Sequence, residues 1–311
     1  MLKQLLISAV FCLLLQVTPV PAAIISLGDS LSDTGNFRAA TNGFVPPAPP
    51  YFPGRFSSGP VWIEHLARAI GQSAPTPSLT GGTNYAYGGA RIAGSSPFGA
   101  PDLQTQATRY LAVHSPQPGD LFTVWGGAND LFFAADNPTA GITPSSVVEA
   151  LGDVLERLAL AGAREFIVPN LPPLGLTPSY RTTPLSGVLD AAAAEFNAML
   201  PGALGVLATR YNAQFYLLDV QGLFDDVLAD PAAFGFVNTT DSATLLDPNF
   251  GLAYELVTPD PDSYVFFDGV HPTGRVHTIL GAQAALLVPE PGYLLMLILA
   301  SSIYFYTQTH N

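Results

Sequence analysis

The sequence predicts an α/β domain, a three-layer α/β/α sandwich with a central parallel sheet of about five strands. Short apolar runs alternate with stretches whose apolar residues recur at helical spacing, as is typical of parallel sheets with crossover helices. Of the 311 residues, 48% are apolar and 11% are charged, which indicates a large core and excludes a disordered chain. The net charge of −13 argues against nucleic acid as a partner, because phosphate backbones repel an acidic surface.

The first 23 residues are expected to be a secretory signal peptide. Lys3 lies before an apolar run from Leu5 to Leu15, and small residues before Ile24 provide a cleavage context. The single cysteine, Cys12, lies inside that run. The mature chain would therefore contain no disulfide.

Five short apolar runs are expected to form the sheet. Each is bounded by turn residues or by a helical pattern, and each is short enough for a buried strand. The runs are Ile24 to Leu27, Asn84 to Tyr87, Leu121 to Trp125, Glu165 to Val168 and Phe215 to Asp219.

Four longer stretches are expected to be helices. The second begins near Thr143, where a threonine N-cap is followed by Pro144 in the first turn. The third is expected to kink at Pro201, since proline removes an intrahelical hydrogen bond. The four stretches run from Trp62 to Ile70, from about Thr143, from about Leu189 to Tyr211, and from Thr273 to Leu287.

Two long segments interrupt this alternation. Arg38 to Pro60 is rich in proline and aromatic residues, and Asp230 to Ser263 is a mostly polar insert without a clear period. Loops of such length are usually functional or mobile. The aromatic residues of the first segment could line an apolar groove or pack over the edge of the sheet: Phe44, Tyr51, Phe52 and Phe56.

Polar residues with complementary chemistry follow the predicted strands. In a parallel sheet, such positions meet at one edge, where ligands bind. A serine on a tight turn, Ser30, needs a base to become a nucleophile. His271 can supply that base, and Asp268 is close enough in sequence to orient its ring. Donors for the oxyanion could be the Ser30 amide, the Asn129 side chain, and a glycine amide.

Four blocks carry a resemblance to a known family. They are Gly28 to Asn36, Asn84 to Ala90, Gly126 to Asp130, and Asp268 to His271. In order and spacing they resemble the signature blocks of the GDSL (SGNH hydrolase) lipases and esterases, from about Ile24 to Leu287, and the segment Pro49 to Gly59 resembles another part common in that family.

The resemblance implies a flavodoxin-like fold and a serine esterase or lipase that acts through an acyl-serine intermediate. Its triad would be Ser30, Asp268 and His271, with Ser30, Gly89 and Asn129 forming the oxyanion hole. Counting from Asn84 favours Gly89 over Gly88 as the donor. No cofactor and no metal would be needed. The substrate stays open among acyl esters, lipids such as phospholipids, and acetylated polysaccharides.

Other chemistry is less well supported by the sequence. His65 and His277 lack a partner at metal-ligand spacing and are expected to be surface or packing residues. No Gly-x-Ser-x-Gly elbow surrounds Ser30, and no phosphate-binding loop follows the first strand. The acidic residues Asp225, Asp226 and Asp230 are expected on a solvated helix face. The alternative to an enzyme is a catalytically silent surface or matrix binding protein with the same fold.

Residues 288–311 resemble a PEP-CTERM sorting signal. Val288-Pro289-Glu290-Pro291 precedes an apolar run that ends at Tyr306, shorter than the roughly 20 residues a spanning helix needs. The expected arginine cluster is replaced by Thr307 to Asn311; the alternative is an ordinary hydrophobic terminal helix. The resemblance implies export from a Gram-negative cell to the periplasm, surface or exterior, with the export and sorting machinery as partners and membrane contact only through the two terminal segments.

Overall fold

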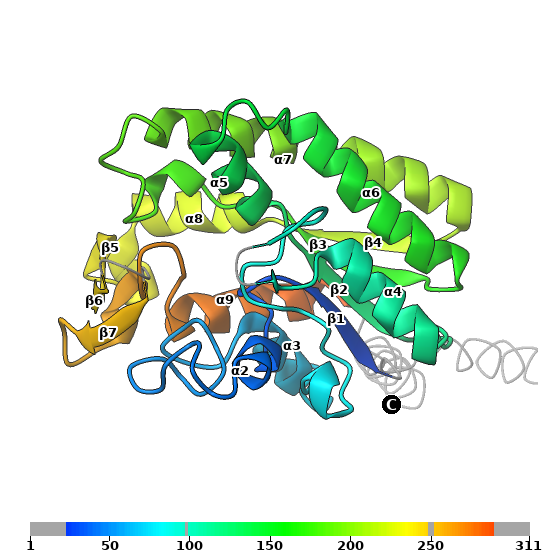
Figure 1. Cartoon of the computed structure of the whole chain (residues 1–311), viewed down its shortest axis with the longest axis horizontal. Coiled ribbons are helices and arrows are strands. Elements are labelled where there is room, and N and C mark those ends of the chain that lie inside the picture. Colours follow the sequence, from blue (N-terminus) through cyan, green and yellow to red (C-terminus); the bar gives the residue numbers. More distant parts are fainter. Residues whose placement is uncertain (1–22, 97–98, 248–251, 289–311) are drawn as a thin grey trace, which may run out of the picture.

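A four-stranded parallel sheet forms the centre of the computed structural model, which describes residues 23–96, 99–247 and 252–288 (Figure 1). Its strands run in the order β1 (Ile24–Gly28), β2 (Leu121–Trp125), β3 (Glu165–Pro169) and β4 (Gln214–Leu218). The predicted parallel sheet is thus confirmed, with strand boundaries that differ by at most one residue. The predicted signal peptide and the sorting segment lie almost wholly outside the described residues.

The prediction of a strand from Asn84 to Tyr87 is wrong. This segment lies beside β1, where the Tyr85 and Tyr87 amides donate to carbonyls of β1, but it forms only an isolated bridge between Ser26 and Asn84. The side-chain amide of Asn36 donates hydrogen bonds to the carbonyls of Asn84 and Ala86. Beyond that bridge, Tyr85 to Tyr87 has no regular secondary structure, and the turn begins at Gly88.

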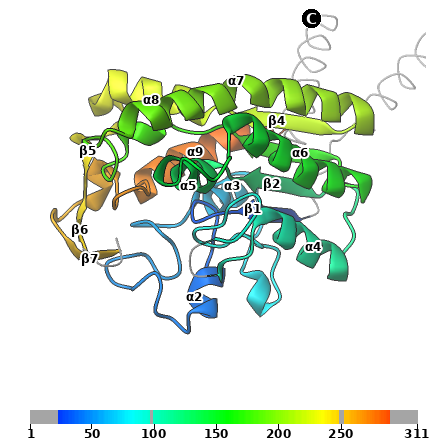
Figure 2. The same ribbon diagram turned by 45° about the horizontal axis from the view of Figure 1, so that its top comes forward.

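Helices cover both faces of the sheet, giving three layers (Figures 1 and 2). One face packs its apolar side chains against α4 (Leu103–Val113), α6 (Pro144–Leu160) and α7 (Ser186–Tyr211). The other packs against α3 (Trp62–Ala69), α8 (Val220–Ala229) and α9 (Gly274–Leu287). Such burial of two apolar faces is what stabilises an α/β sandwich.

The four predicted helices are confirmed as α3, α6, α7 and α9. Thr143 caps α6 by accepting a hydrogen bond from the Ser146 amide, with Pro144 at the first position. α7 continues through Pro201 as one helix. Close contact joins α9 to α3, because a Cβ on Gly281 would lie 2.4 Å from the His65 Cβ.

The insert between β4 and α9 holds structure that the sequence pattern did not predict. β5 (Asn238–Ser242) pairs with β8 (Tyr264–Phe266), and β6 (Thr244–Leu246) pairs with β7 (Ala253–Leu256). Strands of three to five residues are too short to reveal a period. Both views place β5, β6 and β7 together at one end of the molecule, beyond α8 (Figures 1 and 2).

The remaining elements are short. They are the helices α2 (Asn36–Ala40) and α5 (Ala128–Asp136) and the 3₁₀ turns η1 (Ser78–Thr80), η3 (Leu174–Leu176), η4 (Pro231–Phe234) and η5 (Pro261–Ser263).

Candidate active site

Ser30 lies on a tight turn at the carboxyl end of β1. The Asp29 carbonyl accepts the amides of Ser32 and Asp33, and the Asp29 side chain accepts the Leu31 amide at 2.9 Å. Gly28 permits the close approach of β2, since a Cβ there would lie 2.6 Å from the Trp125 carbonyl oxygen. The turn therefore lifts the Ser30 side chain off the sheet edge into a cleft.

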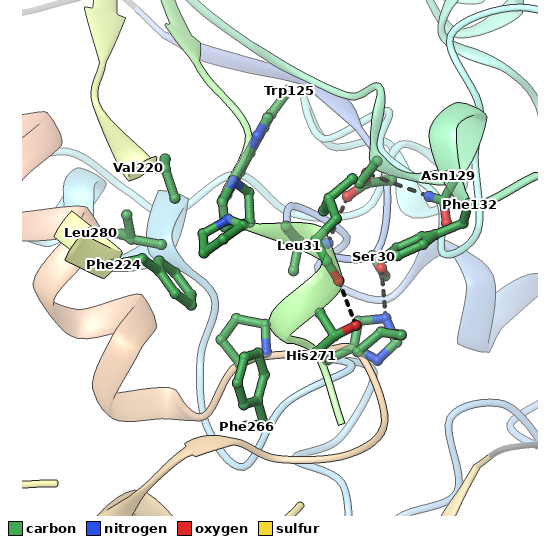
Figure 3. A pocket seen from close by; sticks show the side chains of 18 residues that line it. Ser30, Leu31, Trp125, Asn129, Phe132, Val220, Phe224, Phe266, His271 and Leu280 are labelled. Carbon is green, nitrogen blue, oxygen red and sulfur yellow. Dashed lines mark hydrogen bonds between the residues drawn. The ribbon is translucent and has the colours of Figure 1, made fainter. Parts of the chain in front are cut away.

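The loop between β8 and α9 brings a histidine and an aspartate to this serine. His271 Nε2 lies 2.8 Å from Ser30 Oγ (Figure 3). His271 Nδ1 lies 2.7 Å from Asp268 Oδ2. Asp268 Oδ1 also accepts the amides of Val270 and His271 at 3.0 and 2.8 Å. The three side chains predicted from the sequence thus form one hydrogen-bonded chain, the arrangement that deprotonates a serine during acyl transfer.

Opposing effects act on the Asp268 carboxyl. Its burial favours the neutral form, whereas attraction to His271 and hydrogen bonds from His271, Tyr51 and the Val270 amide favour the anion. The second group prevails, so the pKa of Asp268 lies below its ordinary value. Asp268 is therefore an anion across the neutral range and can stabilise a protonated His271.

Of the donors expected for an oxyanion, Ser30 and Asn129 line the cleft. Asn129, in the first turn of α5, donates to the Ala90 carbonyl at 2.9 Å and its Nδ2 lies 3.4 Å from Asp29 Oδ2. The Gly88 amide donates to Asp33 Oδ2 at 2.9 Å. Within the described part of the chain, no hydrogen bond occupies the amides of Gly89 and Ser30. This favours Gly89 over Gly88 as the free donor.

Asp33 joins the first and second sequence blocks, a role that the sequence reasoning missed. Its carboxylate accepts four backbone amides, those of Gly35 and Asn36 on Oδ1 at 2.7 Å each, and those of Phe37 and Gly88 on Oδ2 at 3.0 and 2.9 Å. Asp33 is fully buried. The sequence offered one signal of this role, the position of Asp33 inside the block from Gly28 to Asn36. Three of its four partners are close in sequence, but the contact with Gly88 cannot be read from sequence spacing.

The cleft beside Ser30 is mostly apolar and partly open to solvent. Figure 3 shows Ser30, His271, Asn129 and Phe132 on one side and Val220, Phe224 and Leu280 on the other. The apolar walls come from β2, α5, η3, α8, β8 and α9, namely Leu31, Trp125, Ala128, Phe132, Pro172, Pro173, Leu174, Val220, Phe224, Phe266, Val270, Pro272 and Leu280.

The proline-rich loop lines none of this cleft. Phe44 and Phe52 are exposed, whereas Tyr51 and Phe56 are buried. The Phe56 ring lies 5.1 Å from the His271 ring, centroid to centroid. The two buried rings therefore pack beside the candidate active site and do not line the cleft.

A second carboxyl borders the cleft. Burial raises the pKa of Asp29 to about 7, and the Leu31 amide and His271 only partly offset that effect. Asp29 therefore changes charge near neutral pH within reach of Asn129.

His65 on α3 is half-buried and His277 on α9 packs within the fold, as predicted for these two residues. His277 is fully buried in α9 and accepts the Trp62 amide on Nδ1 at 3.3 Å; burial lowers its pKa to about 3. His65 lies 3.4 Å from the Thr278 hydroxyl. Among residues 23–96, 99–247 and 252–288, no group of three His, Cys, Asp or Glu could hold a metal ion. On α8, Asp225 and Asp226 are exposed as expected, and Asp230 ends the helix.

Comparison with known proteins gives consistent matches. The sequence model of a family described as GDSL-like Lipase/Acylhydrolase matches residues 24–284. A phosphatidylcholine-sterol acyltransferase from Aeromonas hydrophila is 30% identical over 87% of this chain and 91% of its own length. A thermolabile hemolysin from Vibrio parahaemolyticus is 30% identical over 82% of this chain but 60% of its own length.

Among solved structures, a member of the lipolytic G-D-S-L family from Veillonella parvula matches with a TM-score of 0.47 and 16% identity. That match covers 85% of this chain and 97% of the other.

Proposed function

Because the chain belongs to the GDSL-like lipase/acylhydrolase family and is a carboxylic ester hydrolase, we propose that Ser30, His271 and Asp268 are its catalytic triad. The hydrogen-bonded chain from Ser30 Oγ through His271 to Asp268 is the single observation that carries this proposal. In that chain each group has a role that its chemistry fits: nucleophile, general base and orienting anion.

The reaction runs through an acyl-serine. Ser30 Oγ attacks the ester carbonyl carbon while His271 Nε2 takes the hydroxyl proton. The tetrahedral intermediate collapses as the bond to the alcohol oxygen breaks, and His271 returns the proton to that oxygen. Water then repeats the cycle at the acyl carbon, which frees the acid and restores Ser30.

The oxyanion would be bound by the amides of Ser30 and Gly89 and by Asn129 Nδ2. These donors are held in advance, since Asn129 is tied to the Ala90 carbonyl and Gly88 to Asp33. Donors fixed before reaction need no reorganisation when charge develops on the oxygen.

The apolar cleft favours an ester of a lipid-like acyl chain over an acetylated polysaccharide. Aromatic and aliphatic side chains continue from Ser30 to Phe224 and Leu280, and an acetyl group would leave most of them without contact. The name of the Aeromonas hydrophila relative, a phosphatidylcholine-sterol acyltransferase, accords with such a substrate.

Hydrolysis of p-nitrophenyl esters from acetate to palmitate tests the proposal, with the parent protein, Ser30→Ala and Ser115→Ala assayed together. Ser115 is an exposed serine between α4 and β2, so its removal should leave the rates unchanged. We expect Ser30→Ala to lose at least about 1,000-fold in kcat and to lose labelling by a fluorophosphonate. Equal background rates and no labelling in all three proteins would favour the silent binding protein.

We also propose that the protein is exported and processed at both ends. The basic start and apolar run before Ile24, together with the Val288-Pro289-Glu290-Pro291 box, support this proposal. Intact-mass measurement of the protein from cells and from medium tests it. Retention of residues 1–23 and of 293–306 in every fraction would contradict it.

A further inference from the structure

The hydroxyl of Tyr51 contacts the Asp268 carboxylate. Tyr51 belongs to the proline-rich loop, 217 positions earlier in the chain, and its Oη lies 2.6 Å from Asp268 Oδ2. The side chain is 2% exposed. A buried hydrogen bond to an anion of this length is among the stronger contacts that a neutral group makes.

The direction of this hydrogen bond is fixed by a second contact. The Ala253 amide of β7 donates to the same hydroxyl oxygen at 3.0 Å, so the single hydroxyl proton of Tyr51 is free to point at Asp268. Burial and the neighbouring Asp268 carboxylate raise the pKa of Tyr51 far above its ordinary value. The phenol therefore stays protonated and remains a donor.

Four donors surround the Asp268 carboxylate. Oδ1 accepts the amides of Val270 and His271, which belong to the same turn. His271 Nδ1 lies 2.7 Å from Oδ2 and 2.9 Å from Oδ1, and Oδ2 also accepts the Tyr51 hydroxyl. Tyr51 is thus the contact from a distant part of the chain on the oxygen that faces the histidine ring most closely.

Ring contacts hold the phenol in this place. Tyr51 packs edge to face on Phe267 and on Phe56, with centroids 5.1 and 6.0 Å apart. Phe56 in turn lies against His271. The tyrosine cannot swing away without disturbing rings that border the histidine.

We propose that Tyr51 is a positioning residue of this hydrolase, whose hydroxyl fixes the Asp268 carboxylate and thereby the ring of His271. This inference rests on the triad assigned above. Without the hydroxyl, Asp268 Oδ2 would lose a donor and the carboxylate could rotate away from the plane of the imidazole. The Asp268 anion would also be stabilised by one hydrogen bond fewer. It would therefore attract protonated His271 more strongly.

The first test is Tyr51→Phe, which keeps the ring and its packing. We expect kcat per active site to fall about tenfold with KM changed less than about twofold, since the lost contact acts on the proton transfer and not on substrate binding. Active sites are counted by fluorophosphonate titration. Tyr211→Phe is the matched control, because its hydroxyl also contacts a carboxylate, Glu156, far from the cleft.

The pH profile separates positioning from packing. The titratable groups that face the Asp268–His271 pair are Tyr51 on the proline-rich loop, Asp29 after β1 and His277 on α9. In Tyr51→Phe we expect the acidic limb of kcat/KM to move to higher pH by about half a unit. Replacing Tyr51 with 3-fluorotyrosine, a more acidic phenol and a stronger donor, should move that limb to lower pH.

A double-mutant cycle with Asp268→Ala completes the test. A tyrosine that acts through Asp268 has nothing to position once the carboxylate is gone, so Tyr51→Phe should then change the residual kcat less than about twofold. Equal losses in both backgrounds, or a folded Tyr51→Phe with parental kcat and an unshifted acidic limb, would overturn the inference. If Tyr51→Phe does not fold, the 3-fluorotyrosine protein decides alone, and an unshifted limb refutes the role. An inactive parent protein would instead refute the triad.

Discussion

Asp33→Asn is the sharpest test of how the fold supports the candidate site. The carboxylate accepts two backbone amides on each oxygen. An asparagine offers a carbonyl oxygen to one pair only, and its NH₂ group faces the other pair, donor against donor. Whichever way the amide turns, two buried N–H groups lose their acceptor.

The cost follows from that count. A buried donor left without a partner costs about 1–3 kcal/mol, so two cost about 2–6 kcal/mol, a large part of the roughly 5–15 kcal/mol that a domain has. Burial raises the pKa of Asp33 to about 6, although the amides of Gly35, Phe37, Gly88 and Asn36 oppose it. The comparison therefore belongs at pH 8, where Asp33 is ionised.

Urea unfolding at pH 8 measures the difference. Asp102→Asn is the matched control: Asp102 accepts the Thr105 and Gly94 amides near the surface, where water can replace the lost acceptor, so its loss should stay below about 1 kcal/mol. The kcat of Asp33→Asn reports which pair is lost, because only loss of the Gly88 contact loosens the Gly88–Gly89 turn, which is proposed to supply an oxyanion donor. A free energy of unfolding within about 1 kcal/mol of the parent would refute this reasoning.

Three further outcomes are expected. Asn129→Ala should lower kcat about 100- to 1,000-fold with little change in KM, measured on the best p-nitrophenyl ester; an unchanged kcat would remove Asn129 from the oxyanion hole. Phe224 lines the cleft, so Phe224→Ala, which removes a ring from its wall, should shift the chain-length optimum toward longer acyl groups, and an unshifted optimum would count against the cleft as the acyl site. Burial raises the pKa of Asp130 to about 6, above its ordinary value, so the folded state holds this proton more tightly than the unfolded state does. Unfolding free energy should then fall as pH rises from about 4 to about 6, with Asp130→Asn removing on the order of 3 kcal/mol of that fall; an equal slope in both proteins would contradict this.

The sequence predicts most of the sheet and the side chains at its edge because both follow from local patterns. Parallel strands place their carboxyl ends together, so Ser30 after β1 and Asn129 after β2 had to approach one another. The spacing of Asp268 and His271 within a glycine-containing turn likewise predicts their contact. That these residues catalyse stays a prediction.

What the sequence could not predict depends on distant partners. Asn84 to Tyr87 has the pattern of a strand, yet the side-chain amide of Asn36 donates hydrogen bonds to the carbonyls of Asn84 and Ala86. The pairing of β6 with β7 involves only three residue pairs, too few to leave a periodic pattern in the sequence. Tyr51 is one aromatic residue among several in its loop, and only the folded chain shows that its hydroxyl meets Asp268.

The two ends of the described chain must meet before the candidate site exists. Ser30 and His271 lie 241 positions apart, and β1 pairs with β2 from Ile24 to Leu121 onward, so the contacts are of the long-range kind that form late and slowly. A growing or shortened chain carries the serine without its base until α9 docks on α3. Ester hydrolysis would therefore report directly on the docking of α9 on α3 during folding, because the serine gains its base only at that step.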